Sequence, residues 1–177
     1  KAALEAAQEV GGFLVIDFAY KALVWAETLP DYFSWGPGEN FLSIHSNSKW
    51  CRGLGRRLGW VEAPVQIIKA LEAVQGSSIS CPYTLHQMAL TDYITQGIAA
   101  DSIRPYVRQT AKLYQIAAQK TVRAIETFLK MPCLIPQGGL YTVVRTDAES
   151  SAFTRRILEN TGVIVVPGWG FGDTLRQ

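Results

Sequence analysis

The chain alternates short apolar runs, which are typical of strands, with longer stretches in which apolar residues recur at helical spacing. The short runs predict strands at residues 13–17, 41–45, 58–62, 140–144 and 163–166. The longer stretches predict helices at residues 1–11, 64–74, 82–96, 101–130 and 148–160. Strands that alternate with helices indicate an α/β fold, followed by a smaller α+β part toward the C-terminus.

Glycine, proline and small polar residues mark the boundaries between these elements. Prolines and glycines are frequent from Glu27 to Asn40, which predicts a loop. The run from Gly76 to Ser80 predicts a break between two helices. Asp101 or Ser102 can cap the long helix that follows, because such side chains accept hydrogen bonds from the free N–H groups of a first turn.

The first predicted strand runs directly into an acidic residue. Phe13 to Ile16 are apolar and Asp17 follows, which predicts a buried strand that ends at a carboxylate. Ligands of open α/β sheets bind at the carboxyl ends of the strands. A carboxylate there could pair with the ring nitrogen of a pyridoxal cofactor. The alternative is that Asp17 only caps the following turn.

A lysine lies beside small hydroxyl residues in the segment Ser46-Asn47-Ser48-Lys49, and Arg57 follows shortly afterwards. Lysine amines form Schiff bases with carbonyl groups, including that of pyridoxal phosphate. Serine hydroxyls and an arginine guanidinium group bind phosphate. The pattern therefore indicates an imine between Lys49 and a phosphorylated aldehyde. The alternative is a solvated lysine near a surface cluster of basic residues, Arg52, Arg56 and Arg57.

At these positions the chain resembles the class I/II aminotransferases, pyridoxal-phosphate enzymes of fold type I. The family order of Asp-x-x-Tyr, Ser-x-Ser/Ala-Lys and Gly-x-Arg-Leu-Gly is matched by Asp17, Tyr20, Ser46, Ser48, Lys49, Gly55, Arg57, Leu58 and Gly59. Residues 136–141 resemble the family's Pro-x-Gly-Gly-hydrophobic-Tyr segment. Residues 163–172 resemble its valine-rich strand followed by Pro-Gly and Phe-Gly. The resemblance covers nearly the whole chain.

The resemblance implies an amino-acid aminotransferase with pyridoxal 5′-phosphate as its cofactor. Lys49 would be the catalytic residue and would bind the cofactor covalently. Asp17 would pair with the ring nitrogen and Tyr20 with the ring oxygen. Phosphate would be held by Ser46 and Arg57, and Ser48 also belongs to the implied cofactor-binding set. An amino acid and a 2-oxo acid would be the substrates, and the functional form would be a homodimer.

The resemblance also implies a domain organisation. Residues 1–100 would be the C-terminal part of the large cofactor-binding domain, with a mostly parallel sheet and helices on both faces. Residues 101–131 would be the long interdomain helix, and residues 132–177 an incomplete small C-terminal domain. Enzymes of this family are about twice as long, so we expect the chain to be a fragment. The family's glycine-rich phosphate loop would precede residue 1, and its substrate-carboxylate arginine would lie just beyond Gln177.

Two other functions fit the same motif residues. One is a different pyridoxal-phosphate reaction on an amino acid, catalysed by a cyclase, oxidase, lyase or decarboxylase. The other is a non-catalytic, aminotransferase-like sensing domain of a transcription regulator. The two histidines, His45 and His86, are interpreted as structural rather than catalytic.

Composition and charge narrow the choice of partners. The 177 residues carry a net charge of +2, which gives no electrostatic footprint for a nucleic acid. The cysteines are odd in number and widely spaced, which indicates reduced thiols and a cytoplasmic location rather than disulfides or a zinc site; they are Cys51, Cys81 and Cys133. The sequence contains no apolar run long enough to span a bilayer, so no membrane partner is expected.

Overall fold

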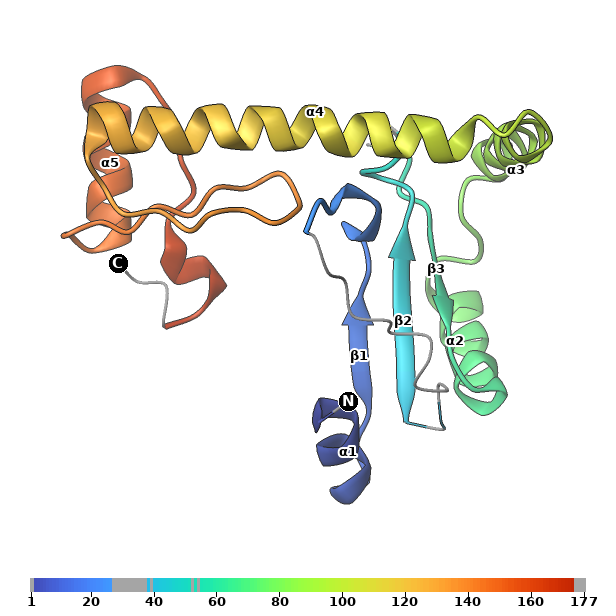
Figure 1. Cartoon of the computed structure of the whole chain (residues 1–177). Coiled ribbons are helices and arrows are strands. Elements are labelled where there is room, and N and C mark those ends of the chain that lie inside the picture. The colour runs from blue at the N-terminus through green and yellow to red at the C-terminus, as the bar shows by residue number, and fades with distance from the viewer. Residues whose placement is uncertain (1, 27–37, 39, 52, 54, 174–177) are drawn as a thin grey trace. The chain divides into compact units, whose positions relative to one another are not determined.

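The computed structural model describes residues 2–26, 38, 40–51, 53 and 55–173 (Figure 1). The elements in chain order are helix α1 (Ala2–Glu9), strand β1 (Leu14–Asp17), 3-10 helix η1 (Lys21–Leu23), strands β2 (Phe41–Ser46) and β3 (Gly59–Glu62), helices α2 (Val65–Ser78), α3 (Thr84–Ala99) and α4 (Ile103–Ala124), π-helix η2 (Ile125–Leu129), helix α5 (Ser150–Thr161) and 3-10 helix η3 (Gly168–Phe171). The loop expected from Glu27 to Asn40 lies largely outside the described residues.

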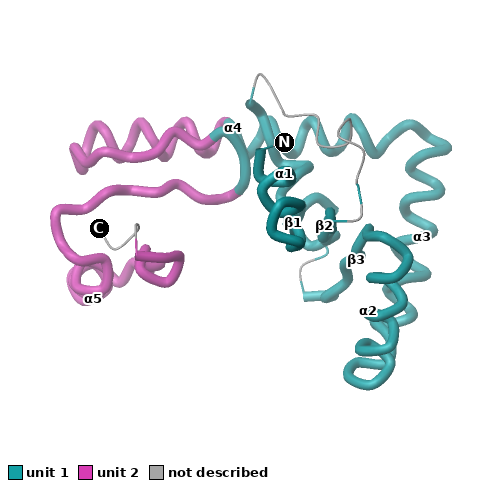
Figure 2. The backbone as a smooth tube through the Cα atoms, turned by 90° about the horizontal axis from the view of Figure 1, so that it is seen from below, with its two compact units in different colours: residues 1–115, 137–139 teal, residues 116–136, 140–177 magenta. Residues whose placement is uncertain are grey.

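The chain divides into two compact units, each made of more than one segment (Figure 2). Unit 1 comprises residues 1–115 and 137–139, and unit 2 comprises residues 116–136 and 140–177. The short segment 137–139 is hydrogen-bonded within unit 1. Gly139 N–H donates to the Leu23 carbonyl at 2.8 Å, and Trp25 N–H donates to the Gln137 carbonyl at 3.0 Å.

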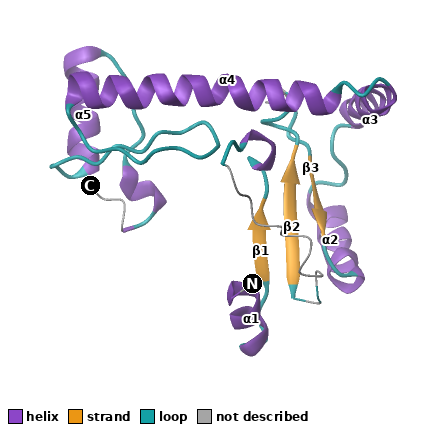
Figure 3. Ribbon diagram, in the orientation of Figure 1, coloured by secondary structure: helices purple, strands orange, loops and turns teal. Residues whose placement is uncertain are grey.

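Unit 1 contains a three-stranded sheet in the order β1-β2-β3 (Figure 3). The α/β class is confirmed, but the described sheet is mixed rather than mostly parallel, because β1 pairs parallel with β2 and β3 pairs antiparallel with β2. This topology places the carboxyl ends of β1 and β2 and the start of β3 at one edge of the sheet. Asp17, Ser46 and Gly59 occupy these three positions, and we call this edge the site edge.

One face of β1 and β2 packs against α1. Leu4 of α1 lies with Phe18 and Phe41 in a buried cluster, and Leu14 and Ile16 pack against it. Successive residues of a strand point to opposite faces. Val15 therefore lies on the other face, where it is 51% exposed. The expectation of a strand buried throughout was wrong, since only the face toward α1 is covered within the described residues.

Helix α2 continues through the position where a break was expected. Gly76 lies inside the helix, which ends only at Ser78. An interior glycine costs a helix about 1 kcal/mol relative to alanine. The hydroxyls of Ser77 and Ser78 donate back to the Val74 carbonyl at 3.0 and 2.7 Å. Serines in the last turn thus bond within the helix instead of breaking it, and the chain leaves the helix at Ser80, whose φ is 65°.

Helix α4 is the long helix that the sequence predicted, and it ends in a π-helical turn. Lys130 N–H donates to the Ile125 carbonyl at 2.9 Å, five residues back, which is the π-helical pattern. This wider turn changes which face each residue presents. Phe128, expected on the apolar face, is 81% exposed, whereas Val122 and Ile125 are buried. None of the helices in the part of the chain that is described combines the length and apolar character needed to cross a bilayer.

Unit 2 does not form the two strands expected at residues 140–144 and 163–166. The first appears only as an isolated antiparallel bridge between Cys133 and Val144. The second is not assigned as a strand. A strand requires a hydrogen-bonded neighbour, and Ile164 and Val166 are 79% and 68% exposed. Apolar, β-branched sequence was therefore not sufficient for strand formation here.

Glu149 caps helix α5, and this predicts a pH-dependent stability. Its carboxylate accepts a hydrogen bond from Ala152 N–H at 3.0 Å. The backbone N–H groups of Ser151 and Ala152 hold the pKa of the Glu149 carboxyl below its ordinary value of 4.5. A carboxyl whose folded pKa is lowered stabilises the fold above its unfolded pKa and loses that contribution as the pH falls through the folded pKa.

We therefore expect Glu149→Ala to lower the thermal unfolding midpoint at neutral pH and to have a shrinking effect as the pH falls below 4.5. Thermal unfolding followed by circular dichroism across this range measures the effect. Glu159→Ala, an exposed position on the same helix, is the matched control. A destabilisation by Glu149→Ala that is the same at every pH would contradict the capping role.

Candidate active site

Asp17 and Tyr20 lie at the site edge because β1 ends there. Asp17 is the last residue of β1, and its Oδ1 accepts a hydrogen bond from Ala19 N–H at 2.8 Å. This local bond turns the chain away from the sheet and leads to Tyr20, which directly precedes η1. The carboxylate of Asp17 is exposed, and its hydrogen bond from Ala19 N–H lies within the same turn. This position is compatible both with a cap of the turn and with a contact to a cofactor.

Ser46 and Ser48 form a hydroxyl pair at the end of β2. The Ser46 Oγ donates to the Ser48 Oγ at 3.0 Å and accepts from Ser48 N–H at 3.2 Å. Ser48 is 6% exposed, so the pair is shielded on one side. These bonds fix the direction of the chain as it leaves β2 and bring two hydroxyl groups to the same place. A preformed pair of this kind suits the binding of an anionic group.

Lys49 lies next to Tyr20, although the two residues come from different strand ends. The Lys49 Nζ is 5.5 Å from the centroid of the Tyr20 ring, a cation–π contact. The parallel pairing of β1 and β2 explains the contact, because it brings the residues that follow each strand to the same edge. The structure thus joins two of the predicted site residues directly.

Arg57 lies in the turn just before β3, also at the site edge. Its φ is 52°, in the left-handed region that residues other than glycine rarely adopt, and its side chain is exposed. The contacts of the described residues do not join Arg57 to Ser46 or Ser48. The proposed phosphate contact of Arg57 therefore stays a prediction, in contrast to the serine pair and to the contact of Lys49 with Tyr20.

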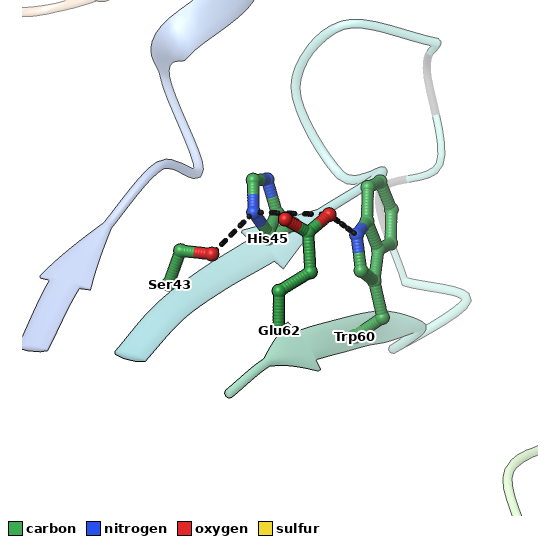
Figure 4. Close-up of polar contacts among 4 residues, drawn as sticks. All are labelled: Ser43, His45, Trp60 and Glu62. Carbon is green, nitrogen blue, oxygen red and sulfur yellow. Dashed lines mark hydrogen bonds and ion pairs between the residues drawn. The ribbon is translucent and has the colours of Figure 1, made fainter. Parts of the chain in front are cut away.

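His45 lies in an aromatic stack on the face of the sheet that packs against α1. Its ring stacks on that of Trp60, with the centroids 5.1 Å apart (Figure 4), and on that of Phe18, with the centroids 5.3 Å apart. Burial lowers the pKa of His45 below its ordinary value of 6.5, the nearby Lys21 lowers it further, and Glu62 opposes both. The imidazole is therefore neutral near pH 7, and its 3.7 Å contact with Glu62 is a polar contact rather than an ion pair.

The sequence did not predict the contact of Asn47, two residues before Lys49, with His86. Asn47 is 0% exposed, and its Nδ2 lies 2.8 Å from Nε2 of His86 on α3. His86 comes 39 residues after Asn47, and its own surroundings in the sequence carry no site pattern. No local pattern could have paired these residues, because the contact depends on where α3 lies.

A family model described as aminotransferase class I and II matches residues 1–176 of the chain. The chain belongs to the class I and II aminotransferases. The resemblance of its motifs to this family is therefore confirmed. The aspartate aminotransferase of Rhizobium meliloti is 24% identical over 179 aligned residues, which cover 90% of this chain and 42% of the relative. The aspartate/prephenate aminotransferase of Thermus thermophilus is 29% identical, covering 90% of this chain and 40% of the relative.

Solved aminotransferase structures share the fold. The aspartate aminotransferase of Thermus thermophilus with maleate superposes with a TM-score of 0.86 and 26% identity, covering 96% of this chain and 44% of that structure's chain. An aromatic aminotransferase of Pyrococcus horikoshii gives a TM-score of 0.84 at 24% identity, covering 97% of this chain and 46% of the other. The fold type I assignment is confirmed. The chain spans less than half the length of the class I and II aminotransferases it matches.

Proposed function

We propose that the protein is a pyridoxal-phosphate-dependent aminotransferase that transfers an amino group between an amino acid and a 2-oxo acid. Support comes chiefly from the contact between Lys49 and Tyr20 at the site edge, beside the hydroxyl pair of Ser46 and Ser48. Family membership supports the same reaction.

The chemistry of these side chains fits pyridoxal 5′-phosphate. The cofactor needs an amine for its aldehyde, an acid for its ring nitrogen, a donor for its ring oxygen, and donors for its phosphate. Lys49, Asp17 and Tyr20 match the first three needs. The fourth is matched by Ser46, Ser48 and Arg57. In the described part of the chain, no group of three or more His, Cys, Asp or Glu side chains could hold a metal ion instead.

Each residue has a distinct role in the proposed reaction. When bound, pyridoxal phosphate supplies an electron sink for the charge that develops at the substrate α-carbon. Lys49 would hold the cofactor covalently, and its Nζ would move the proton at the substrate α-carbon. The Asp17 carboxylate keeps the ring nitrogen protonated. Tyr20 donates to the ring oxygen, and Ser46, Ser48 and Arg57 hold the phosphate in place.

The substrates are proposed only as classes. Relatives are named for aspartate, for aspartate and prephenate, and for valine with pyruvate. These names have an amino acid or a 2-oxo acid in common but differ in side-chain charge and size. We therefore propose an amino acid and a 2-oxo acid as substrates, without a side-chain preference.

A covalent label tests this proposal directly. The protein expressed from its complete coding sequence is incubated with pyridoxal phosphate, reduced with borohydride and digested. Peptide mass mapping is expected to find the pyridoxyl group on Lys49. A label on a different lysine, or no label, would refute the proposed role of Lys49. Conversion of an added 2-oxo acid to its amino acid then separates transamination from a cyclase, lyase, oxidase or decarboxylase reaction and from a sensing domain.

We also propose that the protein acts as a cytoplasmic homodimer. Large apolar side chains are exposed on α2 and α3, including Val65, Val74, Met88 and Ile98. Exposed apolar surface of this kind often marks an association site. Sedimentation velocity of the protein expressed from its complete coding sequence is expected to give the mass of a dimer. A monodisperse, active monomer would contradict this proposal.

A further inference from the structure

Asn47 is a fully buried polar residue two positions before Lys49. It lies between Ser46 and Ser48, and its exposed fraction is 0%. Its side chain reaches α3, where Nδ2 lies 2.8 Å from Nε2 of His86. An amide–imidazole contact thus connects α3 to the segment that carries the lysine.

The backbone of Asn47 is also held on both sides. Its N–H donates to the Leu58 carbonyl at 3.3 Å, next to the start of β3. Its carbonyl accepts a hydrogen bond from the Cys51 Sγ at 3.0 Å, two residues beyond Lys49. Asn47 is therefore tied to the next strand, to the turn after the lysine and, through its side chain, to α3.

The chain that follows Lys49 passes directly over the amide of Asn47. A Cβ at Gly53 would lie 2.8 Å from the Asn47 carbonyl oxygen and 2.9 Å from its Cγ and Oδ1. Only glycine leaves room for this approach. Gly53 therefore packs directly against the carbonyl oxygen and the side-chain amide of Asn47.

The amide of Asn47 also has an unsatisfied atom. Its Oδ1 is buried and has no hydrogen-bond partner among the described residues. Buried polar atoms are nearly always hydrogen-bonded, so an exception calls for an explanation. A rotation of the amide by half a turn would let Oδ1 accept from a protonated Nε2 of His86, but Nδ2 would then lose that partner, because one contact serves one amide atom at a time. In either orientation of the amide, the side chain of Asn47 makes its hydrogen bond to His86.

We propose that Asn47 and His86 are positioning residues that hold Lys49 where its amine can bond to the cofactor. The inference rests on the proposed function and assigns the pair a role that the motif residues do not cover. Asn47 acts through the backbone of the Ser46–Lys49 segment, and His86 acts by holding the amide of Asn47. Without this anchor the lysine amine would spend less time at the reacting geometry, which lowers the rate of bond formation.

The test uses the protein expressed from its complete coding sequence, with Asn47→Ala, His86→Ala and the double variant. Each protein is mixed with pyridoxal phosphate, and borohydride quenching at increasing times gives the rate of labelling at Lys49. The unfolding midpoint without cofactor is measured in parallel. We expect each single substitution to slow labelling about tenfold and the double variant to be no slower than the worse single variant, because coupled residues are not additive.

Two further variants distinguish positioning from general damage. His86→Gln keeps a side-chain donor and acceptor and is expected to restore most of the labelling rate that His86→Ala loses. Asn40→Ala removes an amide bond to the Gly12 carbonyl, 2.7 Å long, just before β2 and away from the site edge, and is expected to leave the rate unchanged. If Asn47→Ala does not fold, the comparison of His86→Ala with His86→Gln decides the question by itself.

The outcomes separate this inference from the proposed function. Labelling at the unsubstituted rate in both single variants would overturn the inference alone. The inference would also be overturned if the labelling rate of the variants fell in parallel with their unfolding midpoints and His86→Gln did not restore it. Absence of any label on Lys49 in the unsubstituted protein would overturn the proposed function and this inference together.

Discussion

Replacement of Lys49 by alanine is expected to lower the rate of transamination by about 10²–10⁴-fold, the usual contribution of a positioned proton-transfer group. The substitution removes the amine that is proposed to bind the cofactor and to move the α-proton. The cation–π contact with Tyr20, with Nζ 5.5 Å from the ring centroid, is lost as well. Lys49 and Tyr20 are both half-buried, and a cation–π contact there contributes about 0.5–2 kcal/mol, so the fold should survive. Steady-state kinetics with an amino acid and a 2-oxo acid measure the loss.

Two control variants make the result specific. Lys49→Arg keeps a positive charge near Tyr20 but cannot form the imine, so it should be as inactive as Lys49→Ala. Lys69→Ala changes an exposed lysine on α2 and should retain full activity. Residual activity in Lys49→Arg close to that of the unsubstituted protein would show that the charge, rather than the nucleophilic amine, is what matters at this position.

Replacement of Asp17 by alanine is expected to lower turnover about a hundredfold or more, a loss comparable to removing one preorganised electrostatic group from an active site. The carboxylate is proposed to keep the cofactor ring nitrogen protonated, and the electron sink weakens without it. Within the described residues, the Asp17 carboxylate accepts a local hydrogen bond from Ala19 N–H at 2.8 Å. Turnover and cofactor occupancy, measured on the same preparation, give the effect.

Asp17→Asn separates the charge of this residue from its structural bond. The amide oxygen of asparagine can still accept from Ala19 N–H, so the turn after β1 is kept while the negative charge is lost. We expect Asp17→Asn to match Asp17→Ala in activity and the unsubstituted protein in its unfolding midpoint. Full turnover in Asp17→Asn with cofactor bound would leave Asp17 as a turn cap and remove it from the mechanism.

The positions of the candidate site residues followed from local sequence patterns. The apolar run before Asp17 predicted a strand end, and the run at residues 41–45 predicted a second strand that leads to Lys49. A strand end is a local property, and parallel pairing then brings two such ends to the same edge. The contact between Tyr20 and Lys49 is the structural consequence, with 5.5 Å from Nζ to the ring centroid.

Features that depend on distant neighbours could not be predicted in the same way. The contact of Asn47 with His86 joins residues 39 apart, and it exists only because α3 lies beside the lysine segment. Residues 163–166 have strand-forming composition, yet they form no strand because no described segment pairs with them. At Gly76 the helix continues to Ser78 although glycine favours a break, and the hydroxyls of the following serines bond to the Val74 carbonyl within the helix.

The division of the chain also has an evolutionary consequence. The chain passes between the two units three times, at residues 115–116, 136–137 and 139–140, so neither unit is one contiguous segment. Exchange of residues 1–115 as a block would pair the Leu23 carbonyl and the Trp25 N–H, just beyond Tyr20, with residues 137–139 of the other parent. Recombination between relatives at the first crossing would therefore separate the segment after Tyr20 from the residues that it is hydrogen-bonded to in its own parent. Residues 137–139 should be inherited together with the segment that contains Tyr20, and a chimaera should carry both from the same parent.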